Sequence, residues 1–174
     1  MILNDTGHME QSLSSYLLHH TGLSMWGDLT IYQNHSIDYR QLMDFLVSHL
    51  VCEKGIHVEI APDVSNELWI GEKLITINSK QTHKKKFFCL VHETGHYVLR
   101  RKREFKMRFP EDYVKEEKQK KTKQFVVDTL REEVLAWEEG LSYAEGLGIN
   151  IDVESYNRQR TAALYKYIEW AVKK

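Results

Sequence analysis

The stretch KKKFFCLVHETGHYVLR, residues 84–100, decides the fold of this chain. Its apolar residues are dense on both sides of a short polar centre, which predicts a helix at the heart of the fold. Asn78, Ser79 or Thr82 can cap its start, because short polar side chains satisfy the unpaired amides of a first helical turn. We expect the elements before and after this helix to pack around it.

Local signals predict three further helices in the rest of the chain. The first runs from Ser36 or Asp38 to about Glu53, and the second runs from about Thr122 to Glu145. The third is capped by Asp152 and lies in the segment 150–174. Gly55 ends the first of them, since a glycine adopts the left-handed conformation that closes a helix. The last helix carries apolar residues on one face, namely Ala163, Leu164, Tyr167, Ile168 and Ala171.

Between the first helix and the central one, the pattern changes to a period of two. Ile56, Val58 and Ile60 alternate with polar residues, and residues 62–63 turn the chain. The segment 67–78 has two short apolar runs around a central turn, which is typical of a β-hairpin. The sequence therefore predicts a small antiparallel sheet beside the helices, and the fold class is α+β.

The 174 residues are expected to form a single domain, 1–174. Residues 1–35 have no clear pattern, and the segment 100–123 is predicted to be a basic loop or lid. Residues 80–123 contain 15 lysines and arginines against 6 acidic residues, although the formal net charge of the whole chain is −1. This asymmetry indicates either a solvated charged segment or a surface for an acidic partner or nucleic acid.

The composition predicts a cytoplasmic protein without a membrane partner. No run of about 18 apolar residues occurs, and the first residues lack the features of a signal peptide. Cys52 and Cys89 are predicted to be free thiols, which suits a reducing compartment.

The central helix contains the pattern His92-Glu93-Thr94-Gly95-His96. Residues four apart lie on one face of a helix, so both imidazoles can reach one Zn²⁺ ion. Glu93 points to one side, where it can take a proton from a metal-activated water as the catalytic base. Gly95 leaves room for a closely packed strand or for substrate. The competing interpretation is that both histidines are ordinary helix residues.

A catalytic zinc site normally has three protein ligands, and no histidine follows His96. A carboxylate is therefore required. Glu133 is the preferred ligand because it lies on the apolar face of the long helix, where a lone carboxylate is costly unless it is paired or metal-bound. Glu132 is the reserve ligand. Asp128 is a weaker candidate, or a residue that orients a histidine.

Tyrosines could add a hydrogen bond to the oxyanion of a transition state. The candidates are Tyr97, Tyr113 and Tyr143. Tyrosines in helices are more often core residues, so no single one is preferred.

Three stretches together resemble the ImmA/IrrE group of zinc metallopeptidases. They are LWIGEKLITIN at 68–78, the motif helix itself, and the later E-x-x-A-W pattern from Glu133 to Trp137. The resemblance covers about 37–140. It implies a minimal zincin-like fold of the gluzincin type, with His92, His96 and Glu133 as zinc ligands, Glu93 as the catalytic acid and base, and Trp137 in an aromatic position.

The same resemblance implies a cytoplasmic endopeptidase that cleaves a regulatory protein such as a transcriptional repressor. A small stand-alone peptidase encoded by a phage or another mobile element would fit the sequence. The sequence departs from the group's pattern at residues 134–135, in the long basic segment, and in the added terminal helix. No DNA-binding or sensor module is recognisable.

Two other functions are compatible with the sequence. A binding protein could use the basic segment 100–123, in which Phe105, Met107 and Phe109 alternate with basic residues, to contact nucleic acid or an acidic protein. A zinc hydrolase could also act on carbonyl compounds other than proteins. An edge strand beside the motif helix would favour peptides, and the hairpin 67–78 is the candidate for it.

Overall fold

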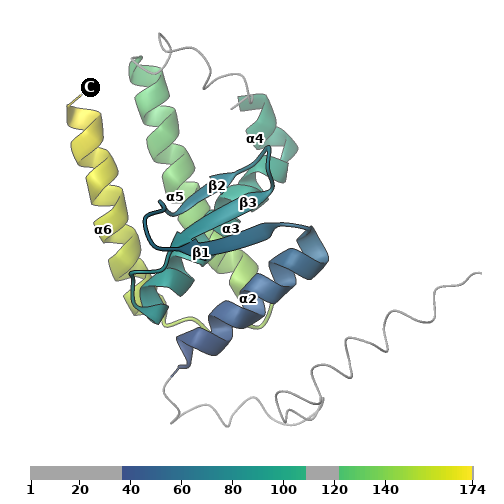
Figure 1. Cartoon of the computed structure of the whole chain (residues 1–174). Helices are drawn as coiled ribbons and strands as arrows, with labels where there is room; N and C mark the ends of the chain where they lie inside the picture. Colours follow the sequence, from purple (N-terminus) through teal and green to yellow (C-terminus); the bar gives the residue numbers. More distant parts are fainter. Residues whose placement is uncertain (1–36, 109–121, 174) are drawn as a thin grey trace, which may run out of the picture. The chain divides into compact units, whose positions relative to one another are not determined.

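A computed structural model describes residues 37–108 and 122–173, and within them there are five helices and a three-stranded sheet (Figure 1). The elements are α2 (Tyr39–Lys54), β1 (His57–Ala61), β2 (Glu67–Trp69), β3 (Leu74–Asn78), α3 (His83–Arg101), α4 (Arg103–Arg108), α5 (Lys123–Gly146) and α6 (Val153–Val172). The predicted α+β class is therefore confirmed. Residues from Asp38 onward form one compact unit. The segment 1–35 lies outside the described residues.

The ends of the long helices follow the local signals in the sequence. Asp38 caps α2 by accepting hydrogen bonds from the amides of Arg40 and Gln41, and Gly55 ends that helix with a φ of 63°. The caps of α3, α5 and α6 are Thr82, Thr122 and Asp152. Each of these side chains accepts a hydrogen bond from the first turn, as an N-cap should.

The sheet is mixed, so the prediction of an antiparallel sheet is wrong in part. The hairpin is present, with β2 antiparallel to β3. However, β1 pairs parallel with β3, and the strand order is β1-β3-β2. The chain leaves β1 and crosses to the far side of β3 before it forms the hairpin. An alternation of period two is common to both pairing directions, so it could not reveal this crossing.

Helix α3 lies behind the sheet and alongside α5 (Figure 1), and it supplies more of the buried apolar core than any other described element. Its buried apolar side chains pack with residues of α2, β3, α5 and α6. The members that lie deepest are Leu46, Leu50, Ile75, Ile77, Phe87, Phe88, Leu90, Val91 and Tyr156. The helix that carries the motif is thus central to the fold, as its apolar density predicts.

Helices α3 and α5 touch through their backbones at two glycines. A β-carbon at Gly95 would lie 1.8 Å from the carbonyl oxygen of Ala136, and one at Gly140 would lie 2.1 Å from that of Val91. Gly95 therefore makes room for α5, and neither of the predicted neighbours, a strand or a substrate, occupies that position. This close approach fixes how the side chains of α3 meet those of α5.

The basic segment is partly helical. Residues 103–108 form α4 directly after α3, although the sequence predicts a loop or lid over 100–123. Phe105 is buried with Leu99 and Ala136, so an apolar anchor within a charged stretch explains why this part is ordered into a helix. Residues 109–121, which include Tyr113, lie outside the described residues.

Two further sequence predictions concern cysteines and membranes. Cys52 and Cys89 are free thiols, as predicted. Among the helices of 37–108 and 122–173, none combines the length and the apolar character that a membrane span requires.

Asp152 ties α6 to α3 and gives a testable pH dependence. Its carboxylate accepts hydrogen bonds from Ser155 and pairs with Lys84 at 3.0 Å, and these contacts hold its pKa below the ordinary value. A lowered folded-state pKa stabilises the fold above the unfolded pKa of about 3.9, and this contribution is lost as the pH falls further. Asp152→Ala should therefore lower the urea midpoint near neutral pH, and the difference should shrink below about pH 4.

The matched control for this experiment is Asp63→Asn. Asp63 pairs with Lys80, but its side chain is 82% exposed and asparagine tolerates the positive φ of 63° at this position, so the free energy of unfolding should hardly change. Equal effects of the two substitutions at neutral pH would contradict the role assigned to Asp152.

Candidate metal centre

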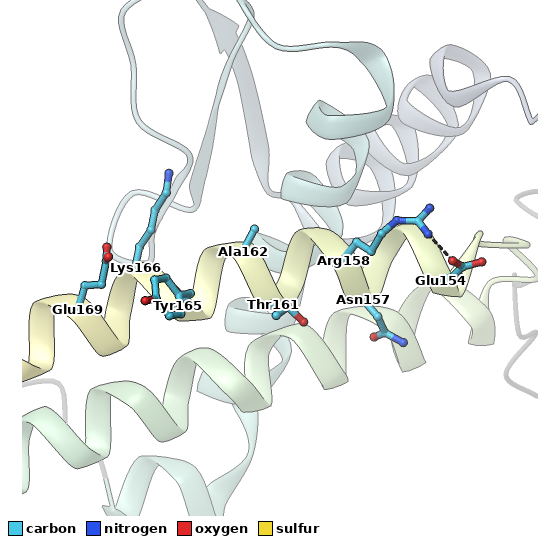
Figure 2. A pocket seen from close by; sticks show the side chains of 8 residues that line it. All are labelled: Glu154, Asn157, Arg158, Thr161, Ala162, Tyr165, Lys166 and Glu169. Atoms are coloured by element: carbon cyan, nitrogen blue, oxygen red, sulfur yellow. Dashed lines mark hydrogen bonds and ion pairs between the residues drawn. The ribbon is translucent and has the colours of Figure 1, made fainter.

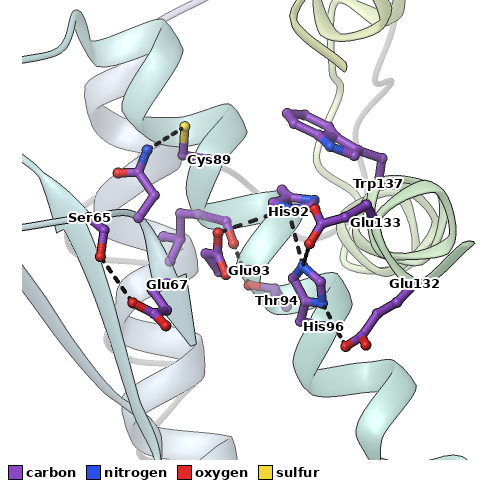
Figure 3. Close-up of polar contacts among 12 residues, drawn as sticks. Ser65, Glu67, Cys89, His92, Glu93, Thr94, His96, Glu132, Glu133 and Trp137 are labelled. Carbon is purple, nitrogen blue, oxygen red and sulfur yellow. Dashed lines mark hydrogen bonds and ion pairs between the residues drawn. The ribbon is translucent and has the colours of Figure 1, made fainter. Parts of the chain in front are cut away.

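Three predicted ligands meet where α3 faces α5 (Figure 3). His92 and His96 lie one turn apart on α3, and their Nε2 atoms are 3.2 Å from each other. The carboxylate of Glu133 comes from α5. Its Oε2 is 3.3 Å from Nε2 of His92, and its Oε1 is 3.6 Å from Nε2 of His96. The ligand atoms of the three residues all lie within 4.8 Å of one another.

These separations fit one metal ion between the three side chains. Ligand bonds of about 2.0–2.1 Å in a tetrahedral site place ligand atoms about 3.3–3.5 Å apart. Within residues 37–108 and 122–173, no donor reaches the buried Oε2 of Glu133 with hydrogen-bond geometry, although Nε2 of His92 lies 3.3 Å away. A buried carboxylate oxygen without a partner is costly. A cation at the point on which the three atoms converge would remove that cost.

The charges of the cluster also favour a cation. Burial lowers the pKa of His96, but contacts with Glu132 and Glu133 outweigh burial and raise the pKa to about 10. Burial raises the pKa of Glu133, but contacts with His92 and His96 hold it at about 2. The carboxylate is thus ionised and the site retains positive charge beside it. A metal ion would supply that charge in place of a proton on the imidazole.

Glu93 lies beside the cluster and is not one of its members. It is 5% exposed, and its Oε1 is 3.9 Å from Nε2 of His92. Burial is the main cause that raises the pKa of Glu93, and the charges of Glu133 and Glu67 raise it further. The two histidines lower this pKa, but the net shift is upward. A raised carboxyl pKa suits a group that accepts a proton and returns it near neutral pH. Glu93 is therefore a buried carboxyl group next to the ligand cluster, with a pKa above its ordinary value.

Glu132, the reserve ligand, contacts the opposite side of His96. Its Oε1 is 3.3 Å from Nδ1 of that imidazole, and Arg100 donates to both of its oxygens, at 2.7 and 3.0 Å from Nη2. Glu132 is thus outside the ligand cluster. The sequence held a signal for this arrangement, because His96 and Arg100 lie one turn apart on the same face of α3.

The remaining predicted site residues are not members of the ligand cluster. Asp128 is buried in α5 but does not belong to the ligand cluster. The hydroxyl of Tyr97 accepts a hydrogen bond from Arg101 at 2.6 Å. The hydroxyl of Tyr143 is 2.8 Å from Nε2 of His49, and burial raises the pKa of Tyr143. Neither tyrosine is brought to the three ligands.

Two aromatic residues do contact the cluster. The Trp137 indole stacks on His92, with ring centroids 4.4 Å apart and planes at 23°. Tyr167 of α6 was predicted only as part of an apolar face. Burial raises the pKa of Tyr167, and its contact with Glu133 raises the pKa further. Nothing in the sequence indicates this second contact, because it depends on how α6 packs.

The basic residues around the end of α3 make contacts within the protein. Arg101 donates to Tyr97, and Lys102 pairs with Glu139, in addition to the contact between Arg100 and Glu132. Part of the positive charge is therefore neutralised internally.

A shallow hollow follows the exposed face of α6 (Figure 2). It is lined by Glu154, Asn157, Arg158, Thr161, Ala162, Tyr165, Lys166 and Glu169. None of these residues belongs to the ligand cluster, and the hollow contains no histidine or cysteine.

No protein family model, curated protein or solved structure matches this chain. The resemblance to the ImmA/IrrE group therefore depends on the three sequence stretches alone. Any function has to be argued from the chemistry of the site.

Proposed function

We propose that this protein is a zinc-dependent endopeptidase. The observation that carries the proposal is the convergence of two imidazole nitrogens and one ionised carboxylate, with Glu93 held beside them. Two histidines and one carboxylate form a ligand set of catalytic zinc sites, which keep a fourth position open. A structural zinc site would not require a buried carboxylate next to the ligands. We also propose that the packing of α3 on the sheet and α5 is a minimal zincin-like arrangement.

The residues divide the chemistry among themselves. His92, His96 and Glu133 would hold the ion, which when bound supplies a Lewis acid that polarises a carbonyl and lowers the pKa of water. A carboxylate oxygen of Glu93 accepts the proton of the attacking water. The same oxygen then gives that proton to the nitrogen of the departing amine. The C–N bond breaks, and the C–O bond formed by the attacking water remains.

The edge of the sheet supports a peptide as the substrate. β2 is an edge strand in the order β1-β3-β2, and Glu67 of β2 is close enough to raise the pKa of Glu93 by its charge (Figure 3). An extended peptide can add to such an edge through backbone hydrogen bonds, and its bonds would then pass beside Glu93. By the resemblance, the substrate would be a cytoplasmic regulatory protein such as a repressor in a phage or mobile-element context.

Zinc binding tests the ligand set. Glu133→Ala should weaken zinc affinity by more than about 100-fold, because it removes a direct ligand and outer contacts alone account for 10–100-fold. Affinity is measured by competition with a chromophoric chelator. Glu139→Ala is the control, because this residue is also a glutamate of α5 but pairs with Lys102. Tight zinc binding by Glu133→Ala would remove Glu133 from the ligand set.

Hydrolysis is tested in cells that express the protein. New protein N-termini should appear in cells with the intact chain and should be absent from cells with the Glu133→Ala variant. In purified form, a candidate substrate found in this way should be cleaved with zinc and spared after chelation. A cleavage pattern that is indifferent to Glu133 and to chelation would contradict the proposal.

A further inference from the structure

A chain of charged contacts extends outward from the metal ligand His96. Its Nδ1 faces Glu132, and both oxygens of Glu132 accept from the guanidinium of Arg100. The Nε of Arg100 adds a third contact at 3.1 Å. The three side chains are only 13–18% exposed. A bidentate pair of this kind in a mostly buried place fixes both partners in orientation as well as in charge.

Arg100 also contacts a side chain of α4. Its guanidinium lies 5.3 Å from the ring centroid of Phe105. Phe105 is 6% exposed and packs with Leu99 and Ala136, which belong to the two helices that carry the ligands. The first turn of the basic segment therefore anchors Arg100 against the body of the protein.

The other histidine is held in a different way. The Nδ1 of His92 is buried and has no hydrogen-bond partner among the described residues. Its ring is fixed instead by stacking on Trp137. A metal-bound histidine usually donates its second N–H to an acceptor, which selects the tautomer and the ring orientation. Within the described residues, only His96 has such an acceptor among the two histidines.

We propose that Glu132 and Arg100 are positioning residues that hold His96 with its Nδ1–H toward Glu132 and its Nε2 toward the metal, and that α4 supports them through Phe105. This inference rests on the metal site of the proposed function. It assigns the start of the basic segment a role behind the metal centre. It also accounts for two adjacent glutamates on α5, of which one binds the ion and the next orients a ligand.

Zinc affinity of four variants tests the proposal, again by chelator competition. Glu132→Ala should weaken zinc binding by about 10–100-fold. Glu132→Gln should lose less, because its amide oxygen can still accept from Nδ1–H. Arg100→Met should weaken binding no more than Glu132→Ala does. The double variant should bind zinc as Glu132→Ala does, because residues that act through one contact are not additive.

A fifth variant tests the role of α4. Phe105→Leu should weaken zinc binding in the natural background and should have no such effect when Arg100 is already methionine. Glu139→Ala is the matched control throughout, since it removes another ion pair between the end of α3 and α5 without touching a ligand.

A second readout separates positioning from general destabilisation. Visible absorption of the Co²⁺-loaded protein reports ligand geometry, and it should change in Glu132→Ala and stay unchanged in Glu139→Ala. Zinc binding by Glu132→Ala that equals the unaltered chain, or a further loss in the double variant, would overturn the positioning role while the metal site stands. Zinc binding that follows these expectations without any peptide cleavage would instead overturn the proposed function alone.

Discussion

Glu93→Gln is expected to abolish peptide hydrolysis while zinc stays bound. The amide keeps the size of the side chain but cannot accept the proton of the attacking water. General acid–base groups contribute about 10²–10⁴-fold, so kcat should fall by at least that factor. Zinc affinity should change little, because Glu93 lies outside the ligand cluster. The measurement is cleavage of the identified substrate, together with zinc content of the same preparation.

The control for this prediction is Glu67→Gln. It removes a neighbouring carboxylate of β2 that raises the pKa of Glu93 by its charge and is not a member of the ligand cluster. Cleavage should therefore persist in that variant. Persistent cleavage in Glu93→Gln would refute the assignment of the base.

The same substitution separates the peptidase from a protein that acts by contact. A binding protein that uses its basic segment does not require a proton acceptor beside the histidines, so its biological effect would survive Glu93→Gln. A zinc hydrolase with a small substrate would lose activity in the variant, but no cellular protein would be shortened by the unaltered chain. Substrate cleavage and biological effect should therefore be measured on the same variant.

Features determined by neighbouring residues could be predicted from the sequence. The caps at Asp38, Thr82, Thr122 and Asp152 follow from side chains that bind amides two or three residues away. The preference for Glu133 over Glu132 as a member of the cluster follows from helix periodicity, because Glu133 lies on the apolar face of α5. In both cases, the physical cause lies within about one helical turn.

Features that depend on distant parts of the chain could not be predicted. The parallel pairing of β1 with β3 is set by where the chain crosses, and the apolar alternation is the same for either direction. The contact of Tyr167 with Glu133 depends on the packing of α6. The contact of Glu132 with His96 depends on which face of α5 meets α3. The charged residues can be read from the sequence, but which of them pair cannot.

Gly95→Ala and Gly140→Ala are expected to be the most destabilising small substitutions in the described part of the chain. Each added methyl group would meet a backbone carbonyl of the facing helix at about 2 Å, and backbone cannot rotate away as a side chain can. Overpacking typically costs about 1–3 kcal/mol and sometimes more. A clash with backbone belongs at the upper end, which is a large part of a typical stability of about 5–15 kcal/mol.

The expected loss opposes the intrinsic preference of a helix. Alanine favours an interior helical position over glycine by up to about 1 kcal/mol, so a net loss can come only from the contact between the helices. Gly146→Ala is the matched control on α5, because nothing lies within 4 Å of a β-carbon there. It should leave the urea midpoint unchanged or raise it. A similar loss of stability in Gly146→Ala would show that the destabilisation does not come from the contact between α3 and α5.

The same substitutions should weaken zinc binding even in molecules that remain folded. His92 and His96 belong to α3 and Glu133 to α5, so the distance between these helices sets the distance between the ligands. To admit a methyl group, α3 and α5 must separate by more than 1 Å or slide, because ordinary contacts of a β-carbon begin at 3.4 Å. The Nε2 to Oε separations of 3.3 and 3.6 Å would then exceed what one ion can span. Zinc affinity at a temperature where Gly140→Ala is still folded tests this link, and unchanged affinity there would mean that the backbone contact does not set the geometry of the metal centre.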